Sequence, residues 1–210
     1  VITYRDSEGN EHTTHLMGKY NFDNIRAALA LGKLFGVSES QAHAGVCSYE
    51  PTNNRSQLIQ KESNTILMDA YNANPDSMRA GLKALAWMGR QGPPESRSWA
   101  VLGEMAELGD DAISEHDRIG RLAVRLDVSR LIVVGTGRAM GAMLHGAVME
   151  GSWGSEATAV ADTDAALALL RAELQPGDVV LVKASNSAGL GALADALAAD
   201  IPDVPGEGGG

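Results

Sequence analysis

The sequence predicts an α/β fold in which a mostly parallel β-sheet is covered by helices on both faces. Short apolar segments alternate with amphipathic helical segments over most of the chain, which is typical of a parallel sheet with helical crossovers. Segments such as Ile66–Met68 and Val180–Val182 are continuously apolar, as expected of strands buried on both faces. Aromatic residues make up only 4% of the chain, while Ala and Gly are abundant, which favours close packing of helices on the sheet. We therefore expect a Rossmann-like architecture.

The first 57 residues follow a different pattern. We expect a hairpin of residues 1–5 and 12–16 around a turn at 6–10, a break at Gly18–Asn21, a helix over about 22–35, and a second helix after Ser38. Ser38 and Gln41 have the spacing of a capping box. Residues 50–55 resemble a loop, because Pro, Thr and two Asn residues disfavour regular structure.

The second predicted domain comprises residues 58–203, and residues 204–210 form a Gly-rich tail that we expect to be disordered. Strands are predicted at 65–68, 99–102, 130–134, 158–161 and 179–182. Helices are predicted at 75–88, 112–126, 138–148, 162–173 and 188–199.

The charge, hydropathy and cysteine content of the chain exclude several classes of binding partner and site. A net charge of −10 argues against nucleic acid and anionic membranes, which both attract basic surfaces. No apolar run approaches the roughly 20 residues that a membrane-spanning helix needs. The single cysteine, Cys47, excludes an internal disulfide and a thiolate zinc cluster, and no metal site is expected in the chain. A monomer in a reducing cytoplasm is the simplest expectation.

Polar residues follow four of the predicted strands. These segments are Asp69–Ser77, Gly103–Gly109, Gly135–Gly137 and Lys183–Ser187. In open parallel sheets, ligands bind in the crevice beyond the carboxyl ends of the strands. The sequence therefore predicts a small-molecule site along this edge.

Several of these residues also have a purely structural interpretation. Asn74 before Pro75 is typical of a helix N-cap, although this does not explain Asp69, Tyr71 and Asn72. His116, in a first helical turn, could be an ordinary solvated side chain. Lys183 could be a surface lysine near a capped helix, or a cation that binds a carboxylate or phosphate together with neighbouring serines. The residues alone leave these alternatives open.

Taken together, the motifs resemble the Mur ligase family. Gly18–Ala28 resembles the family's Gly-x-[His/Tyr]-Asn-x-x-Asn-x-x-Ala-Ala signature, and Arg55 stands where the family carries an arginine at a domain junction. Asp69–Ser77 resembles the branch that adds D-alanyl-D-alanine, and so does Leu102–Gly109 followed by Ser114–Gly120. The ordered match runs from Gly18 to about Ala199.

The resemblance implies the end of a central ATP-binding domain followed by a complete C-terminal domain. It also implies an ATP-dependent amide ligase of peptidoglycan synthesis, which joins D-alanyl-D-alanine to a UDP-N-acetylmuramoyl-tripeptide through an acyl phosphate. The implied ATP-binding residues are Asn21, Asn24, Arg55 and Asp69. The implied substrate-binding residues are Tyr71, Asn72, Asn74, Ser77, Glu104, His116, Lys183 and Ser185.

Two departures from the family pattern affect these expectations. The family reads Lys-Gly-Ser-Arg at the last strand end, whereas this chain reads Lys183-Ala-Ser-Asn186, and Asn lacks the two-pronged cation of Arg. No Gly-x-x-Gly-Lys-Thr/Ser phosphate loop is present, and the family's Mg²⁺ ligands are expected upstream of Val1. We therefore expect a fragment that is inactive alone and contains no complete catalytic set.

The alternatives are a sister ligase, such as a folylpolyglutamate-type enzyme, and a Rossmann-like binding module without chemistry.

Overall fold

The computed structural model describes residues 2–16, 20–50, 55–61, 64–151 and 156–200, and these form two compact units. The units comprise residues 1–52 and 53–210. Within the described residues, no helix is both long enough and apolar enough to cross a membrane. The predicted break at Gly18–Asn21 is wrong for Tyr20 and Asn21, with which the first helix begins, while residues 18 and 19 and the predicted tail lie outside the described residues.

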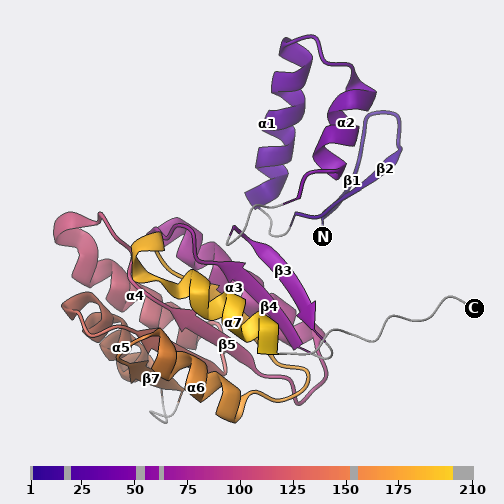
Figure 1. Ribbon diagram of the computed structural model, residues 1–210. Coiled ribbons are helices and arrows are strands. Elements are labelled where there is room, and N and C mark those ends of the chain that lie inside the picture. Colours follow the sequence, from indigo (N-terminus) through magenta and orange to yellow (C-terminus); the bar gives the residue numbers. More distant parts are fainter. Residues whose placement is uncertain (1, 17–19, 51–54, 62–63, 152–155, 201–210) are drawn as a thin grey trace, which may run out of the picture. The chain divides into compact units, whose positions relative to one another are not determined.

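The first unit is a hairpin with two helices (Figure 1). Strands β1 (Ile2–Arg5) and β2 (Glu11–Thr14) pair antiparallel, as predicted. Helix α1 spans Tyr20–Leu34 and α2 spans Glu39–Cys47. Both predicted helices are thus confirmed, and Ser38 forms the expected capping box with Gln41.

The second unit is built on a six-stranded sheet of order β3-β4-β8-β5-β6-β7, which confirms the predicted fold class. The strands are β3 (Gln57–Lys61), β4 (Asn64–Asp69), β5 (Ser98–Leu102), β6 (Arg130–Val134), β7 (Ala157–Val160) and β8 (Val179–Lys183). All neighbouring strands run parallel except β3, which pairs antiparallel with β4.

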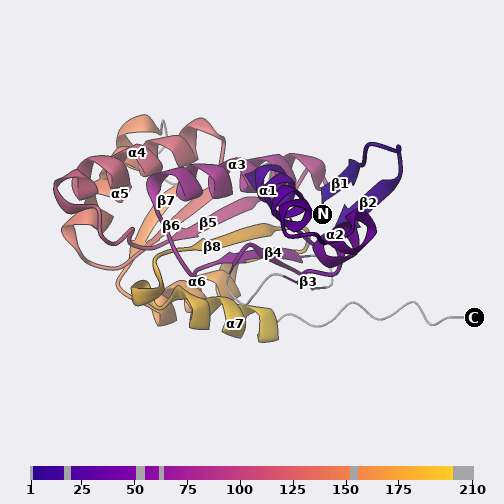
Figure 2. The ribbon, with the colours of Figure 1, turned by 90° about the horizontal axis from the view of Figure 1, so that it is seen from above.

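Five long helices cover the two faces of this sheet. They are α3 (Pro75–Gln91), α4 (Ala112–Arg125), α5 (Arg138–Glu150), α6 (Thr163–Glu173) and α7 (Leu190–Asp200). Figure 2 shows α3, α4 and α5 on one face and α6 and α7 on the other. Alternate residues along each strand feed two separate cores: Leu67 and Leu181 pack with α3 to α5, and Ile66 and Val180 pack with α6 and α7.

Strand β3 was not predicted from the sequence. Among its five residues only Leu58 and Ile59 are apolar, which is too short a pattern to stand out beside a polar loop. Gln57 pairs with Met68 of β4, and the two compact units divide between residues 52 and 53, a few residues before the domain boundary expected after residue 57.

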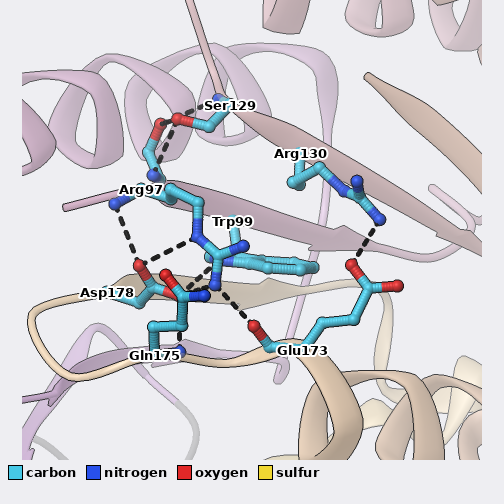
Figure 3. Close-up of polar contacts among 8 residues, drawn as sticks. Arg97, Trp99, Ser129, Arg130, Glu173, Gln175 and Asp178 are labelled. Atoms are coloured by element: carbon cyan, nitrogen blue, oxygen red, sulfur yellow. Dashed lines mark hydrogen bonds and ion pairs between the residues drawn. The ribbon is translucent and has the colours of Figure 1, made fainter. Parts of the chain in front are cut away.

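The amino ends of the central strands are joined by a buried polar network around Asp178 (Figure 3). The Asp178 side chain is fully buried, and it accepts hydrogen bonds from the Trp99 indole (2.9 Å), the Arg97 guanidinium (2.7 Å) and the backbone N–H groups of Arg97 and Gln175. Arg97 and Arg130 both lie over the Trp99 ring. This network lies at the amino ends of β5 and β8, opposite the polar residues at the carboxyl edge of the sheet, which we call the rim. We therefore expect the network to stabilise the fold rather than to bind a ligand.

A candidate ligand site at the carboxyl edge of the sheet

The carboxyl ends of β4, β8 and β5 lie side by side and form a topological switch point. The connections after β4 and β5 lead to α3 and α4 on one face of the sheet, whereas the connection after β8 leads to α7 on the other face (Figure 2). Chains that leave in opposite directions open a crevice between neighbouring strand ends, where ligands bind in open α/β sheets. Asp69, Lys183 and the start of the Gly103–Gly109 loop all lie at this point.

Lys183 and Asp69 form a buried ion pair at the centre of this edge. The Lys183 Nζ atom lies 2.5 Å from Asp69 Oδ2 and 2.9 Å from the carbonyl oxygen of Asn72. The Lys183 side chain is only 1% exposed. Gly81 of α3 leaves space for its stem, since a Cβ at Gly81 would lie 3.2 Å from Lys183 Cδ. The interpretation of Lys183 as a surface lysine is therefore wrong.

The second oxygen of the Asp69 carboxylate holds the chain segment that leads into β3. Asp69 Oδ1 accepts hydrogen bonds from the Ser56 backbone N–H (2.9 Å) and the Ser56 hydroxyl (3.3 Å). The neighbouring Arg55 guanidinium lies 3.7 Å from the centroid of the Tyr71 ring. Asp69 thus connects three segments, and the structure brings Arg55, Asp69 and Tyr71 together at this edge.

Asn74 and Ser77 are occupied with the start of α3. The Asn74 side chain accepts a hydrogen bond from Ser77 N (2.9 Å), and the Asn74 backbone N–H donates to the Ser77 hydroxyl (3.0 Å). This is a complete capping box, with Pro75 at the first helical position. The structural interpretation of Asn74 is confirmed, and Ser77 is its reciprocal partner.

His116 and Ser185 fix the shape of the Gly103–Gly109 loop. His116 Nε2 accepts a hydrogen bond from Met105 N (2.9 Å), and Nδ1 donates one to the Ala112 carbonyl (2.6 Å), which defines a neutral tautomer. The Ser185 hydroxyl accepts a hydrogen bond from Ala106 N (2.9 Å). His116 is fully buried, so its interpretation as a solvated side chain is wrong. Both side chains thus hold the loop through its backbone N–H groups.

Other side chains along the same edge remain available to a ligand. Glu104 is exposed, and its carboxylate forms no hydrogen bond or ion pair with any residue that the structure describes. Tyr71 is 47% exposed beneath Arg55, and the Asn72 and Asn186 side chains are also exposed. The edge therefore presents an aromatic ring, two amides and a free carboxylate over a layer of buried polar residues.

Asn21 and Asn24, the other two predicted ATP-binding residues, lie in the first unit. Asn24 Nδ2 donates a hydrogen bond to Asn21 Oδ1 (2.8 Å) across one turn of α1, and Asn21 is buried. Their pairing gives a fixed arrangement of amide groups at the start of α1.

Comparison with known proteins decides the family. Residues 54–186 match the model of the Mur ligase, glutamate ligase domain. The chain belongs to the Mur ligase family. It is 61% identical over 196 residues to UDP-N-acetylmuramoyl-tripeptide–D-alanyl-D-alanine ligase of Mycobacterium tuberculosis, which covers 87% of this chain. The chain spans only 38% of the length of that relative.

Solved structures of Mur ligases share the fold. MurF from Acinetobacter baumannii matches with a TM-score of 0.78 and 26% sequence identity, over 94% of this chain and 42% of that protein. MurF from Thermotoga maritima, solved in complex with ADP, matches with a TM-score of 0.70 and 21% identity, over 88% of this chain and 39% of that protein. At 21% identity, the second match supports the fold alone.

Proposed function

We propose that this chain is part of an ATP-dependent ligase that adds D-alanyl-D-alanine to a UDP-N-acetylmuramoyl-tripeptide. The observation that carries the proposal is the 61% identity to a relative with that name, which extends over both units. The proposal includes a cytoplasmic role in the synthesis of peptidoglycan precursors, and through it in cell shape and division. Residues 1–52 would then be the end of the ATP-binding domain.

The proposal assigns different roles to the residues of the rim: some would contact ATP, some would contact the dipeptide, and the buried ones would hold the others in position. Asp69 and Arg55 would face the ribose and the phosphates of ATP. For Asn21 and Asn24 the family resemblance implies a role in ATP binding. Ribose hydroxyls that bind Asp69 would compete with Ser56 for Oδ1, because both donate to the same oxygen. Nucleotide binding would therefore weaken the contact that holds Ser56 at the start of the second unit.

The dipeptide side of the site would be formed by exposed residues. Glu104 is a free carboxylate suited to hold the ammonium group of the incoming dipeptide until it loses its proton and attacks. Tyr71 and Asn72 would line the adjacent wall. The Lys183 ammonium already contacts the Asp69 carboxylate and the Asn72 carbonyl. Lys183 would therefore hold these two residues in position rather than bind the dipeptide carboxylate.

The proposed reaction has two steps. ATP phosphorylates the terminal carboxylate of the tripeptide, and the amine of D-alanyl-D-alanine then displaces phosphate from the acyl phosphate. Mg²⁺ would offset the phosphate charge, while this chain's residues would orient the amine and the nucleotide. Because the 210 residues contain no Gly-x-x-Gly-Lys-Thr/Ser loop, we expect no turnover by them alone.

The test measures phosphate release by the full-length gene product with ATP, UDP-tripeptide and D-alanyl-D-alanine. We expect Glu104→Gln to raise the KM for the dipeptide about tenfold, which corresponds to the loss of one charge-assisted hydrogen bond. Glu107→Gln is the matched control, because Glu107 is another exposed carboxylate of the same loop. Equal effects of the two variants would remove Glu104 from the site.

The two alternatives give different outcomes in the same assay. A sister ligase would prefer a single amino acid, such as meso-diaminopimelate, lysine or glutamate, over D-alanyl-D-alanine. A binding module without chemistry would release no phosphate with any of these acceptors. Turnover by the isolated chain would refute our expectation that it is incomplete.

A further inference from the structure

The first unit contains a cluster of two histidines and an aspartate, residue types that can bind a metal, and the proposed ligase reaction assigns them no role. Asp6 lies in the β1–β2 turn, His12 on β2 and His43 on α2. One ligand atom from each lies within 4.8 Å of the others. His12 Nε2 and Asp6 Oδ2 are 2.9 Å apart, and His43 is 6% exposed. Residues about 30 positions apart in the sequence thus converge on one point.

We propose that Asp6, His12 and His43 bind a divalent transition-metal ion, with Zn²⁺ as the natural probe. Two imidazoles and one carboxylate form a ligand set suited to Zn²⁺, Ni²⁺, Cu²⁺ or Fe²⁺, whereas Mg²⁺ prefers oxygen ligands and water. A set of three protein ligands leaves a fourth position open. This site differs from the expectation, drawn from the single cysteine, that the chain holds no metal site, and the three residues form no local spacing motif in the sequence.

The groups around the cluster already hold two of the ligands in place. The backbone N–H groups of Glu8 and Asn10 both donate to Asp6 Oδ1 at 2.9 Å, which directs Oδ2 toward His12. The Tyr4 hydroxyl lies 2.8 Å from His43 Nδ1. A proton on Nδ1 would be donated to the Tyr4 oxygen and leave Nε2 free as the ligand, which is the usual support for a metal-binding histidine.

The fourth position has a candidate ligand and an access route. Glu39 Oε1 lies 3.9 Å from His43 Nε2, one turn before it on α2. A cavity of about 750 Å³ is lined by Asp6, His43 and Glu39, among others. The Glu39 carboxylate or a water molecule from this cavity could complete a tetrahedral site.

Metal binding requires a small rearrangement of the rings. The His12 and His43 rings are stacked, with centroids 4.1 Å apart and planes within 9°. Zn²⁺ lies about 2.0–2.1 Å from each imidazole nitrogen that binds it, close to the plane of the ring. Both rings therefore tilt toward the ion, which takes the place of the hydrogen between His12 Nε2 and Asp6 Oδ2. The His12 side chain is 20% exposed, so it has solvent on one side into which to move.

The test is a Zn²⁺ titration of the chelator-treated chain by calorimetry, with a Mg²⁺ titration beside it. We expect one Zn²⁺ per chain and no saturable Mg²⁺ binding. His12→Gln and Asp6→Asn should each weaken Zn²⁺ binding at least tenfold. His145→Gln is the matched control, because His145 also contacts a carboxylate, Asp117, at 3.1 Å but belongs to no such cluster among the described residues.

Three titration results would overturn the proposal: no saturable Zn²⁺ binding by the wild-type chain, unchanged binding in both cluster variants, or an equal loss in His145→Gln. Circular dichroism of each variant separates loss of a ligand from loss of the fold. X-ray absorption at the zinc edge provides a second measurement, since two imidazoles and oxygen ligands are expected, and a spectrum without imidazole would contradict the site.

Discussion

The buried pair of Lys183 and Asp69 makes a quantitative prediction about how the rim is held together. The two partners differ in their surroundings: the Lys183 side chain is 1% exposed and Asp69 is 19% exposed. Removing one member of a buried ion pair costs about 3–5 kcal/mol, because the remaining charge is left without compensation. The unequal burial of the partners should make the cost depend on which one is removed.

Asp69→Asn leaves the ammonium of Lys183 buried, with its hydrogen bond to the Asn72 carbonyl but without a counter-charge, so we expect a loss of about 4 kcal/mol. Lys183→Met removes the ammonium and keeps the length of the side chain. Asp69 then retains two hydrogen bonds from Ser56 and some contact with solvent, so the expected loss is smaller, about 2 kcal/mol. The double variant should lose less than the sum, by about 2 kcal/mol.

Urea unfolding of the whole chain measures these changes. Trp99 is fully buried in the same sheet, so its fluorescence reports on the second unit even if the first unit unfolds separately. A loss below about 0.5 kcal/mol in both single variants would indicate a surface pair. Additive effects, or a larger loss in Lys183→Met than in Asp69→Asn, would refute the reasoning about unequal burial.

Three further predictions follow from other contacts. Asp178→Ala should destabilise the chain by about 4 kcal/mol, whereas Asp200→Ala, which breaks a surface pair, should cost less than about 1 kcal/mol; similar urea midpoints would contradict this. Hydrogen bonds from Arg125 lower the pKa of Glu150 in the folded chain, so this pair stabilises above the unfolded pKa of about 4.3 and is lost as pH falls through the folded value. Arg125→Ala should therefore destabilise at pH 7 and have little effect near pH 2; a difference that does not change with pH would refute this assignment. Asn186→Arg should lower the KM of the full-length enzyme for D-alanyl-D-alanine by restoring a two-pronged cation on the exposed rim, and an unchanged or higher KM would argue against a carboxylate there.

Much of the fold follows from local sequence, because apolar runs and helical periodicity are properties of neighbouring residues. Strand β6 has the predicted bounds, and Pro75 marks the true start of α3. Strand β3 escaped prediction because its neighbour β4, rather than its own apolar content, makes it a strand. Local patterns thus identified the other edge strand, β7, but not β3, in which only two of five residues are apolar.

The roles of the site residues could not be derived in the same way. The order of the strands places Lys183 beside Asp69, 114 positions earlier in the chain, and no local feature indicates that β8 enters the sheet next to β4. The burial of His116 depends on the preceding loop folding over it. Nothing in the sequence singled out Ser56 as a partner of Asp69. The sequence therefore predicted which strand ends carry polar residues. Only the structure shows which of these side chains are exposed and which are buried beneath them.

The distinction between exposed and buried residues explains how the chain accommodates its difference from the family pattern at the end of β8. The segment Lys183-Ala-Ser-Asn186 differs from the family pattern at its second and fourth positions. Ala184 is buried, and it is accommodated because Gly103 opposite has no side chain: a Cβ at Gly103 would lie 2.9 Å from that of Ala184. Lys183 and Ser185, which match the pattern, hold Asp69 and the Gly103–Gly109 loop. The change at Asn186 falls on an exposed side chain, so it alters what the rim offers to a ligand without disturbing the buried contacts that shape it.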